Sequence, residues 1–424
     1  MKVLLISANT ERITMTVPPV GLASVAAATQ AAGHEVIMVD LMATEEGAQT
    51  AVAAAIDPFD ADVIGISVRN IDDQRMESPK FLLAPVREIV AECRRLTRAP
   101  TVLGGAGFSI FPASVLAYLD ADMGIRGEGE EAFPALLSII RNGQDPSGVP
   151  GLYLPGAGTK AKRSFIRDLD SLPVPNRHLH LLQPADRDLW IQIQTRRGCP
   201  MGCSYCSTAA IEGRSIRKRS PESVVRQISE TVQAGFHRFY FVDNTFNLPP
   251  SYAKELCRKI IASGHRIAWL CIVYPRYVDA ELADLMARAG CRHISLGFES
   301  GSPPILKNMN KRFTPEDVRR IAALFAATGI KQQGFLMLGG PVETRETVEQ
   351  SIDFADSLPI DGLKVTTGIR IYPETTLSEI ARADGTIAPD DDLLHPRFYM
   401  AHALRDWLPE RIAQWTSARP QWIS

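Results

Sequence analysis

The sequence predicts an α/β protein in which a doubly wound parallel sheet is followed by a partial (β/α)6 barrel and a short C-terminal extension. The prediction depends on two series of alternating strand and helix patterns, because such alternation is typical of parallel sheets. Between them, residues 149–188 are rich in proline and glycine and keep no sustained period, as expected of a linker. The 424 residues also exceed what one hydrophobic core usually supports. We therefore predict domains at residues 1–148 and 189–388, and the extension at 389–424.

The composition is that of a soluble globular protein, with 45% hydrophobic and 22% charged residues. A net charge of −2 provides no long-range attraction to a polyanion, so we expect no nucleic-acid partner. No apolar run reaches the roughly 18 residues that a membrane-spanning helix needs. The 7 cysteines follow no disulfide-like framework, which indicates the reducing cytoplasm.

In the first domain, short apolar runs alternate with helical patterns. Pro18-Pro19 opens an alanine-rich helix that ends at Gly33. A later helix carries apolar residues at helical spacing from Leu82 to Leu96, with Cys93 on its buried face. The predicted strands are 3–7, 35–40, 63–68, 101–103 and 122–125. This order favours a sheet of the Rossmann or flavodoxin type, whose ligands bind beyond the carboxyl ends of the strands.

In the second domain the alternation produces six strand–helix units. The predicted strands are 190–194, 238–242, 267–273, 293–298, 333–338 and 363–371. Units of this kind curl into a complete or partial barrel, and the active sites of such barrels lie at the carboxyl ends of the strands. Residues that follow these strands are therefore the candidates for function.

Three cysteines follow the first barrel strand: Cys199, Cys203 and Cys206, in a loop that also contains glycine and proline. Cysteine thiolates are the usual ligands of a [4Fe–4S] cluster, and three of them leave one iron open to bind a reactant. Zinc is the alternative. Structural zinc sites almost always have four ligands, however, and the next cysteine is the distant Cys257.

The loop, with Tyr205 before its last cysteine, resembles the cluster loop of the radical S-adenosylmethionine (SAM) enzymes. The resemblance implies that the open iron chelates the amino and carboxylate groups of SAM. It also implies that one electron, from a donor such as flavodoxin or ferredoxin, cleaves SAM to methionine and a 5′-deoxyadenosyl radical.

The same resemblance implies SAM contacts at the ends of the barrel strands. Glu299 would hold the ribose or amino group of SAM, and Lys311 its carboxylate, although an ordinary ion pair at the barrel rim is the alternative. The backbone of Gly339 and Gly340 would lie along the adenine or methionine moiety. The full set is Tyr205, Asp243, Asn244, Glu299, Ser300, Lys311, Gly339, Gly340, Arg370 and Tyr372.

The first domain is similar to the cobalamin-binding domain found in one branch of this family. Three segments carry the similarity: Pro18–Leu22, Val102–Gly105 and Gly127–Glu130. The residues implied for cobalamin are Asn9, Thr10, Ser67, Val68, Arg69, Asn70, Gly104, Gly105, Ala106, Gly127, Glu128, Gly129 and Glu130. The sequence lacks the Asp-x-His-x-x-Gly motif that supplies a lower histidine ligand, so Arg69 and Asn70 are expected near the lower face of the cobalt. A loop salt bridge is an equal alternative for Arg69.

Two further sets of residues are weaker candidates. Cys271 alternates with Trp269 and Val273 along one strand, so it could touch the substrate if that face points inward; simple burial is the alternative. Near the C-terminus, His395, Arg397 and Tyr399 could contact the substrate, or could instead have packing or helix-cap roles.

Taken together, the resemblance implies a cobalamin-dependent radical SAM methyltransferase. Such an enzyme methylates an unactivated carbon by means of methylcobalamin and a 5′-deoxyadenosyl radical. One alternative keeps both cofactors but performs a rearrangement, ring contraction or cyclisation. A second alternative is a non-enzymatic metal-binding module. Small molecules, peptides and lipids are all open as substrates.

Overall fold

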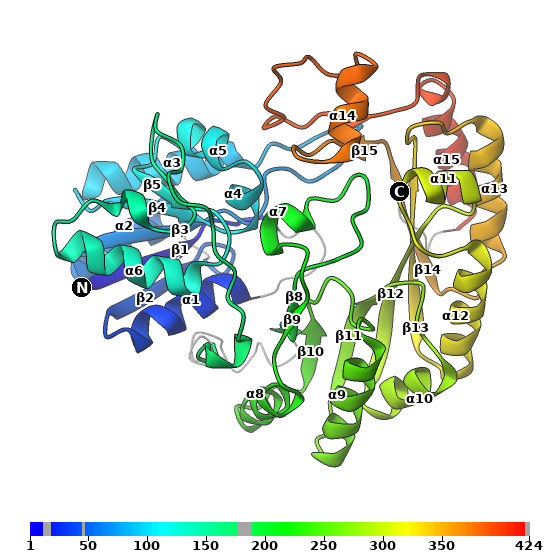
Figure 1. The fold of residues 1–424 in the computed structure, drawn as a ribbon, viewed down its shortest axis with the longest axis horizontal. Coiled ribbons are helices and arrows are strands. Elements are labelled where there is room, and N and C mark those ends of the chain that lie inside the picture. Colours follow the sequence, from blue (N-terminus) through cyan, green and yellow to red (C-terminus); the bar gives the residue numbers. More distant parts are fainter. Residues whose placement is uncertain (12–17, 45–46, 176–188, 420–424) are drawn as a thin grey trace. The chain divides into compact units, whose positions relative to one another are not determined.

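The computed structural model describes residues 1–11, 18–44, 47–175 and 189–419, and these residues form two compact units. The first unit comprises Met1–Asp73, Pro79–Asp186 and Ser207–Gly213, and the second comprises Gln74–Ser78, Arg187–Cys206 and Arg214–Ser424 (Figure 1). Two short segments, Gln74–Ser78 and Ser207–Gly213, therefore pack with a different unit from the residues on either side of them in the chain. The described part of the predicted linker packs with the first unit, while residues 176–188 and 420–424 lie outside the described residues.

The first unit contains a six-stranded sheet in the order β2-β1-β3-β4-β5-β6, which confirms the predicted doubly wound sheet. Its five predicted strands are parallel, and the short β6 is added antiparallel to β5. The strands are β1 (Lys2–Ser7), β2 (Glu35–Asp40), β3 (Val63–Ser67), β4 (Thr101–Gly104), β5 (Met123–Ile125) and β6 (Leu152–Tyr153). The helices are α1 (Val20–Ala31), α2 (Ala48–Phe59), α3 (Leu83–Leu96), α4 (Ala106–Ile110), α5 (Pro112–Leu119) and α6 (Gly129–Arg141).

The apolar strands of this sheet are buried because helices cover both of its faces, as is usual for parallel sheets. Val3, Leu4 and Ile6 of β1 are fully buried. The amphipathic α3 buries its apolar face as its spacing predicts, and that face includes Cys93. Burial raises the pKa of the Cys93 thiol to about 12, so this cysteine is an inert part of the core.

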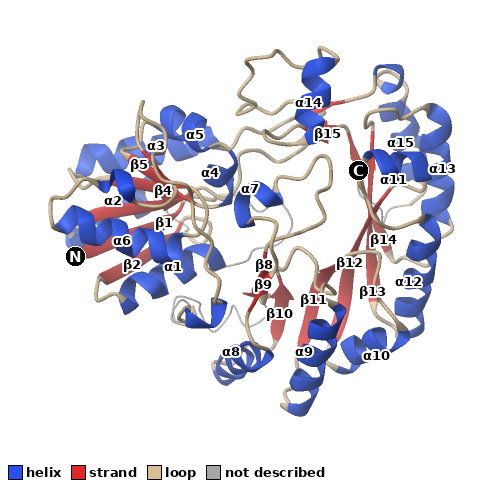
Figure 2. Ribbon diagram, in the orientation of Figure 1, coloured by secondary structure: helices blue, strands red, loops and turns tan. Residues whose placement is uncertain are grey.

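The second unit contains a parallel six-stranded sheet in the order β14-β13-β12-β11-β10-β7, with helices along one face (Figure 2). The sheet does not close on itself, so the predicted partial barrel is confirmed. Its strands are β7 (Ile191–Ile193), β10 (Arg238–Phe241), β11 (Ala268–Val273), β12 (Cys291–Glu299), β13 (Lys331–Leu338) and β14 (Gly362–Thr367). Its helices are α8 (Pro221–Gln233), α9 (Pro250–Ala262), α10 (Ala280–Arg288), α11 (Pro303–Asn308), α12 (Pro315–Ala327), α13 (Arg345–Asp356), α14 (Thr376–Ala383) and α15 (Leu408–Ser417).

Smaller elements accompany the barrel. Gly368, with a positive φ of 74°, ends the last strand earlier than predicted and separates β14 from a short hairpin. That hairpin pairs β15 (Ile369–Arg370) with β16 (Phe398–Tyr399). A second hairpin, β8 (Arg196–Arg197) with β9 (Arg217–Lys218), flanks the cysteine loop, and α7 (Thr208–Glu212) follows the loop.

Alternate residues of the barrel strands face the helices and the barrel interior. In β11, Trp269, Cys271 and Val273 are almost fully buried, whereas Leu270 and Ile272 on the other face are half-buried. The indole N–H of Trp269 donates to the carbonyl of Ala289, directly after α10, so the buried face is the helix-facing one. Cys271 shares that face and is fully buried, as the alternative of simple burial expects. The interior is lined instead by the half-buried residues.

Among the described residues, no helix is both long and apolar enough to cross a membrane.

The aromatic cluster on the helix-facing side of the barrel generates a stability prediction. Trp269 packs against Phe241 and Phe246, with ring centroids 5.0 and 4.9 Å away. We expect Trp269→Ala to lower the free energy of unfolding by about 3–5 kcal/mol, because the cavity cannot collapse fully. Denaturant unfolding followed by circular dichroism measures this. Leu270→Ala, on the interior face, is the control and should cost less than half as much; equal losses would contradict the assignment of the two faces.

Candidate functional site

The cysteine loop is held in place by hydrogen bonds between its backbone and two distant segments of the same unit. The N–H of Ser204 donates to the carbonyl of Met309 (3.1 Å), and the Asn310 side-chain amide donates to the carbonyl of Gly202 (2.6 Å). On its other side, the N–H of Leu377 in α14 donates to the carbonyl of Ser204 (2.8 Å). The loop conformation is therefore determined by tertiary contacts rather than by the loop sequence alone.

Lys311 occupies the centre of a buried polar cluster beside this loop. Its ammonium donates to the Tyr205 hydroxyl (2.8 Å) and lies 3.2 Å from a carboxylate oxygen of Glu299. The side chains of Lys311 and Glu299 are only 5% and 13% exposed. The structure thus brings together three of the residues that the sequence implied for SAM, next to Cys203, which also interacts with Lys311.

The electrostatics of this cluster keep Lys311 charged. Burial opposes the charge on Lys311, but Glu299, Tyr205 and Cys203 together raise its pKa well above the usual value. Burial raises the pKa of the Cys203 thiol, and the charge of Lys311 offsets part of this shift. A permanent cation next to Cys203 therefore stabilises the thiolate that iron requires.

Glu299 has an unusual backbone conformation. It has a φ of 62°, which a non-glycine residue rarely adopts, and it ends β12 where the register with β13 shifts. Such strain is often concentrated at functional sites, where the surrounding structure enforces it. Here it turns the carboxylate towards Lys311.

Asp243 has a different role from the SAM contact that the sequence implied. It is fully buried, and it accepts hydrogen bonds from the backbone N–H groups of Thr195 (2.7 Å) and Arg196 (3.1 Å) and from the Thr195 hydroxyl (2.6 Å). The guanidinium of Arg196 lies 3.3 Å away, between the rings of Phe246 and Tyr252. Asp243 thus anchors the strand that leads into the cysteine loop.

Ser300 and Arg370 are likewise used within the protein. The Ser300 hydroxyl is buried against the Ser351 hydroxyl of α13 (2.9 Å). The guanidinium of Arg370 donates to the carbonyls of Ile371 (2.7 Å) and Leu393 (2.9 Å), and Tyr372 lies across it. These two residues support the loops around the site. Asn244 follows β10 and is half-buried.

The Gly339-Gly340 turn after β13 is organised by Glu343, which the sequence analysis missed. One oxygen of its carboxylate accepts from the N–H groups of both glycines, at 3.0 Å for Gly340. Its other oxygen is buried without a hydrogen-bond partner among the described residues. Burial raises the pKa of Glu343 to about 7 despite the two N–H donors. The feature of the sequence that could have identified Glu343 is a carboxylate three residues after the pair Gly339-Gly340.

The cysteine loop fits a four-iron cluster. Within the described part of the chain, no three His, Cys, Asp or Glu side chains converge on one point as ligands of a single ion would. A cluster binds each cysteine at a separate iron, so it does not need that convergence. Cys199 and Cys203 are half-buried and Cys206 is exposed, so all three are accessible to a bound group.

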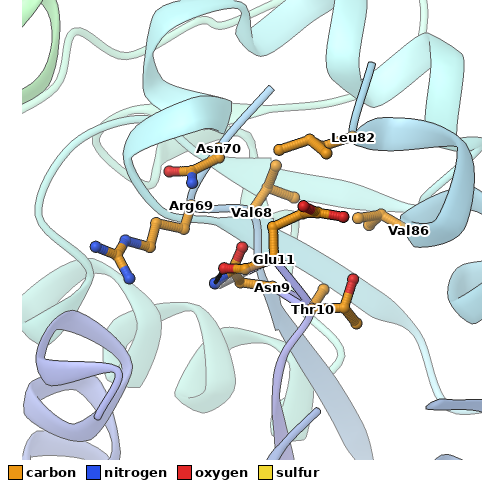
Figure 3. A pocket seen from close by; sticks show the side chains of 9 residues that line it. Asn9, Thr10, Glu11, Val68, Arg69, Asn70, Leu82 and Val86 are labelled. Atoms are coloured by element: carbon orange, nitrogen blue, oxygen red, sulfur yellow. Dashed lines mark hydrogen bonds between the residues drawn. The ribbon is translucent and has the colours of Figure 1, made fainter. Parts of the chain in front are cut away.

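In the first unit, five of the implied cobalamin residues gather where β1 and β3 end. A small pocket there is lined by Ala8, Asn9, Thr10, Glu11, Val68, Arg69, Asn70, Leu82 and Val86 (Figure 3). The strands β1 and β3 are neighbours, but the chain continues from β1 to β2 on one side of them and from β3 to β4 on the other. Such switch points are the usual ligand sites of doubly wound sheets. The charge of Arg69 also reaches Asp40, whose pKa is raised by burial and lowered in part by this arginine.

The loop after β4 leaves room for a ligand. A Cβ at Gly104 would meet no atom within 4 Å, whereas one at Gly105 would approach the carbonyl oxygen of Val68 to 2.6 Å. Gly105 also has a φ of 95°, so only glycine fits there. Its conformation starts α4 at Ala106, and the space above Gly104 remains open to a bulky group.

The Gly127–Glu130 segment has a structural role that the sequence did not indicate. Glu128 accepts a hydrogen bond from the N–H of Ile166 (2.7 Å), and Glu130 is buried in the first turn of α6. Arg163, close to Ile166 in the chain, donates to the carbonyls of Ala209 and Ala210 in α7. This segment therefore helps to hold the helix that follows the cysteine loop.

Two of the C-terminal candidates form contacts within the protein. Near the C-terminus, Tyr399 donates to Asp384 (2.8 Å) and Arg397 pairs with Asp391 (2.8 Å). These contacts give Tyr399 and Arg397 the packing role that the sequence analysis left open.

Two family models match this chain. Residues 6–137 match the B12 binding domain, and residues 193–355 match the radical SAM superfamily. The chain is 29% identical to an uncharacterized methyltransferase of Pyrococcus horikoshii, over 91% of this chain and 84% of that protein. It is 24% identical to the tryptophan 2-C-methyltransferase of Streptomyces laurentii, over 88% of this chain and 73% of that protein.

The fold is shared with a solved structure over the whole chain. The radical S-adenosylmethionine methyltransferase TsrM from Kitasatospora setae, solved with cobalamin and a [4Fe–4S] cluster bound, superposes with a TM-score of 0.86. The match covers 100% of this chain and 92% of TsrM, at 24% sequence identity.

The buried cluster around Lys311 generates a prediction on SAM binding. Lys311→Met removes the cation and leaves Glu299 buried without its partner. We expect SAM cleavage by the reduced, cluster-loaded protein to fall on the order of a hundredfold. Release of 5′-deoxyadenosine, measured by chromatography, tests this. Lys307→Met replaces an exposed lysine of α11; it is the matched control and should behave like the wild type. Equal activity of both variants would refute the role of Lys311.

Glu343 generates a prediction on pH-dependent stability. Its pKa is higher in the folded than in the unfolded state, so its contribution is fully present below about pH 4.5 and is lost as the pH rises through about 7. Glu343→Gln keeps an acceptor for the glycine N–H groups but removes the titration. Between pH 5 and 8, the free energy of unfolding of the wild type should fall relative to that of the variant, by at most about 3 kcal/mol. Parallel pH profiles of the two proteins would contradict this.

Proposed function

Because the chain belongs to the radical SAM superfamily and carries a B12-binding domain, we propose that it is a cobalamin-dependent radical SAM methyltransferase acting on an unactivated carbon. The observation that carries the proposal is similarity along nearly the whole chain, through both domains, to proteins named as methyltransferases, one of them a tryptophan 2-C-methyltransferase. Shorter matches include the bacteriochlorophyllide d C-12(1)-methyltransferase of Chlorobaculum tepidum, 30% identical over 46% of this chain.

A second function is supported by a specific but weaker observation. The chain is 26% identical to the anaerobic magnesium-protoporphyrin IX monomethyl ester cyclase of Rubrivivax gelatinosus, over 80% of this chain and 62% of that protein. A cyclase would use both cofactors without transferring a methyl group. The methyltransferases of Pyrococcus horikoshii and Streptomyces laurentii match over a larger share of both chains, which favours methylation.

The residues of the second unit have distinct tasks in this proposal. Cys199, Cys203 and Cys206 bind the cluster, and Lys311 and Glu299 bind the charged end of SAM, whose carboxylate and ammonium complement them. Tyr205 orients Lys311 through its hydroxyl. The Gly339-Gly340 turn, held by Glu343, borders the adenine or methionine moiety. Asp243 and Arg196 keep the strand before the loop rigid.

In the first unit, the ends of β1, β3 and β4 hold cobalamin. Asn9, Thr10, Arg69, Asn70 and the open surface at Gly104 are the groups that would hold it, with Arg69 where other cobalamin proteins offer a histidine. When bound, the cluster supplies one electron for the cleavage of SAM, and cobalamin carries the methyl group. The protein contributes position and protection from water.

We also propose a substrate class, an electron donor and a cellular location. The substrate is a small molecule, as in the relatives named above. The electron comes from a donor such as flavodoxin or ferredoxin. A cytoplasmic location follows from the need for free, reduced cysteines.

The cluster ligands are tested by Cys203→Ala. We expect this variant, reconstituted anaerobically, to lose bound iron and sulfide and to lose all SAM cleavage, because the remaining two thiolates cannot hold the cluster. Cys93→Ala, in the core of the other unit, is the control and should retain both. Undiminished SAM cleavage by Cys203→Ala, or zinc in place of iron in the wild type, would refute the assignment.

The reaction type is tested by product analysis with candidate substrates. A methyltransferase of this kind consumes two SAM molecules and should yield S-adenosylhomocysteine and 5′-deoxyadenosine in about equal amounts. A cyclisation or rearrangement should yield 5′-deoxyadenosine with little S-adenosylhomocysteine. Failure of the purified protein to bind cobalamin at saturating supply would refute the cobalamin site independently.

A further inference from the structure

The part of the second unit next to the cysteine loop carries cations without carboxylates. Four segments of this unit are joined there by the contacts given below: residues 195–206, 214–220, 274–278 and 301–315. None of these segments contains an aspartate or a glutamate, although the chain as a whole has a net charge of −2. Positive charge is therefore concentrated around the cysteine loop, where it can attract an acidic partner.

Arg214 lies directly against the cysteine loop. A Cβ at Gly202 would lie 3.2 Å from a guanidinium nitrogen of Arg214 and 3.5 Å from the side-chain amide nitrogen of Asn310. Arg214 is exposed, and it forms no ion pair with any residue that the structure describes. Its charge is therefore available to a partner, beside the residue that precedes Cys203.

Two further arginines lie beside Lys311. The guanidinium of Arg276 donates to the carbonyl of Arg312 (2.6 Å), and the N–H of Arg312 donates to the Tyr274 hydroxyl (2.9 Å). Arg312 is exposed and Arg276 is half-buried. Neither arginine pairs with a carboxylate in the described part of the chain, so both charges are uncompensated.

An exposed aromatic ring adjoins these arginines. Tyr277 is 46% exposed, and Val342 is the only other exposed large hydrophobic residue among those that the structure describes. The guanidinium of Arg276 lies 4.9 Å from the centre of the Tyr277 ring. Tyrosine and arginine are enriched among the residues that contribute most to protein–protein binding. Their combination at this surface favours a protein as the partner.

The loop that presents Tyr277 is fixed from below by the fully buried Asn247. The side-chain amide of Asn247 donates to the carbonyls of Tyr274 (3.0 Å) and Arg276 (2.6 Å), and its oxygen accepts from the N–H of Tyr274 (2.9 Å). Tyr277 itself has a φ of 62°, and strain of this kind is often maintained at functional sites. The ring is therefore held in its exposed position before a partner binds, which reduces the entropy cost of binding.

We propose that Arg214, Arg276, Tyr277 and Arg312 form the docking surface for a small acidic electron-transfer protein. This assignment rests on the proposed function, in which each cleavage of SAM needs one electron. In the transfer, one electron passes from the reduced centre of the donor to the cluster, and no bond forms or breaks.

The position and the charge of the surface both suit such a donor. The loop that Arg214 contacts carries the three cysteines, so a donor bound here reaches the cluster by a short path. Opposite charges accelerate the encounter of the two proteins. Complexes between electron-transfer proteins are usually transient and have small interfaces, so a few residues are enough to form one.

Binding of acidic probe proteins to the full-length, cluster-loaded protein tests the inference without turnover. Anaerobic titration calorimetry would use a flavodoxin and a [2Fe–2S] ferredoxin, which are acidic, and compare them with the basic cytochrome c and a short DNA duplex. We expect at least one of the acidic proteins to bind, and cytochrome c not to bind. The affinity should fall about tenfold when the salt concentration rises from about 50 to about 200 mM.

Three variants locate the surface, and a fourth is the matched control. Arg214→Glu should weaken binding of the acidic protein about tenfold, and Arg312→Gln should weaken it by a smaller factor. Tyr277→Ser should weaken it about fivefold, because the aromatic contact is lost. Lys331→Glu changes an exposed lysine at the start of β13, at the opposite end of the strands, and should leave binding unchanged.

The electron source separates docking from catalysis. With dithionite as the reductant, SAM cleavage by the three variants should equal that of the wild type. With the reduced acidic protein as the donor, cleavage should slow in the same order as binding weakens. Failure of the wild type to cleave SAM with dithionite would contradict the proposed function, whereas the binding measurements would still decide the present inference.

Three outcomes would overturn the inference. The first is that neither flavodoxin nor ferredoxin binds to the wild type. The second is that Arg214→Glu and Tyr277→Ser bind the acidic protein as tightly as Lys331→Glu does. The third is that the DNA duplex binds as tightly as the acidic proteins, which would make this surface a general site for polyanions.

Discussion

The ion pair between Lys311 and Glu299 is the interaction on which the catalytic end of the barrel depends. Two charges that are nearly removed from solvent are costly unless each is compensated. Here Tyr205 and Cys203 complete the surroundings of Lys311, and the strained φ of Glu299 orients its carboxylate. The cysteine loop, the end of β12 and the turn before α12 are thereby held at one point, although 106 residues separate Tyr205 from Lys311 in the chain.

Buried carboxylates perform a second, recurring task at the strand ends. Asp243 accepts backbone N–H groups where β7 leads into the cysteine loop, and Glu343 accepts those of the Gly339-Gly340 turn. In each case the carboxylate satisfies donors that have no partner in the sheet, so a sharp turn is held in one conformation. Rigid turns of this kind position a bound cofactor without using the groups that contact it.

Charge in the barrel is unevenly compensated, and that difference carries information. Lys311 and Arg196 each lie beside a carboxylate, as buried cations normally do. Lys364, half-buried in β14, forms no ion pair with any residue that the structure describes, and burial lowers its pKa.

The sequence by itself determined the two alternating series, the three cysteines at their fixed spacing and the apolar face of α3, because these depend on local pattern. It also singled out Lys311 and Glu299, which the structure brings together as an ion pair. Only the tertiary structure decided that Cys271 faces the helices, that the Asp243 carboxylate accepts backbone N–H groups and that Glu343 organises a turn. The physical reason is that a strand alternates its side chains equally well in either sense, and only packing chooses which face becomes the interior. The exchange of Gln74–Ser78 and Ser207–Gly213 between units is likewise invisible to local pattern, because contacts between distant segments create it.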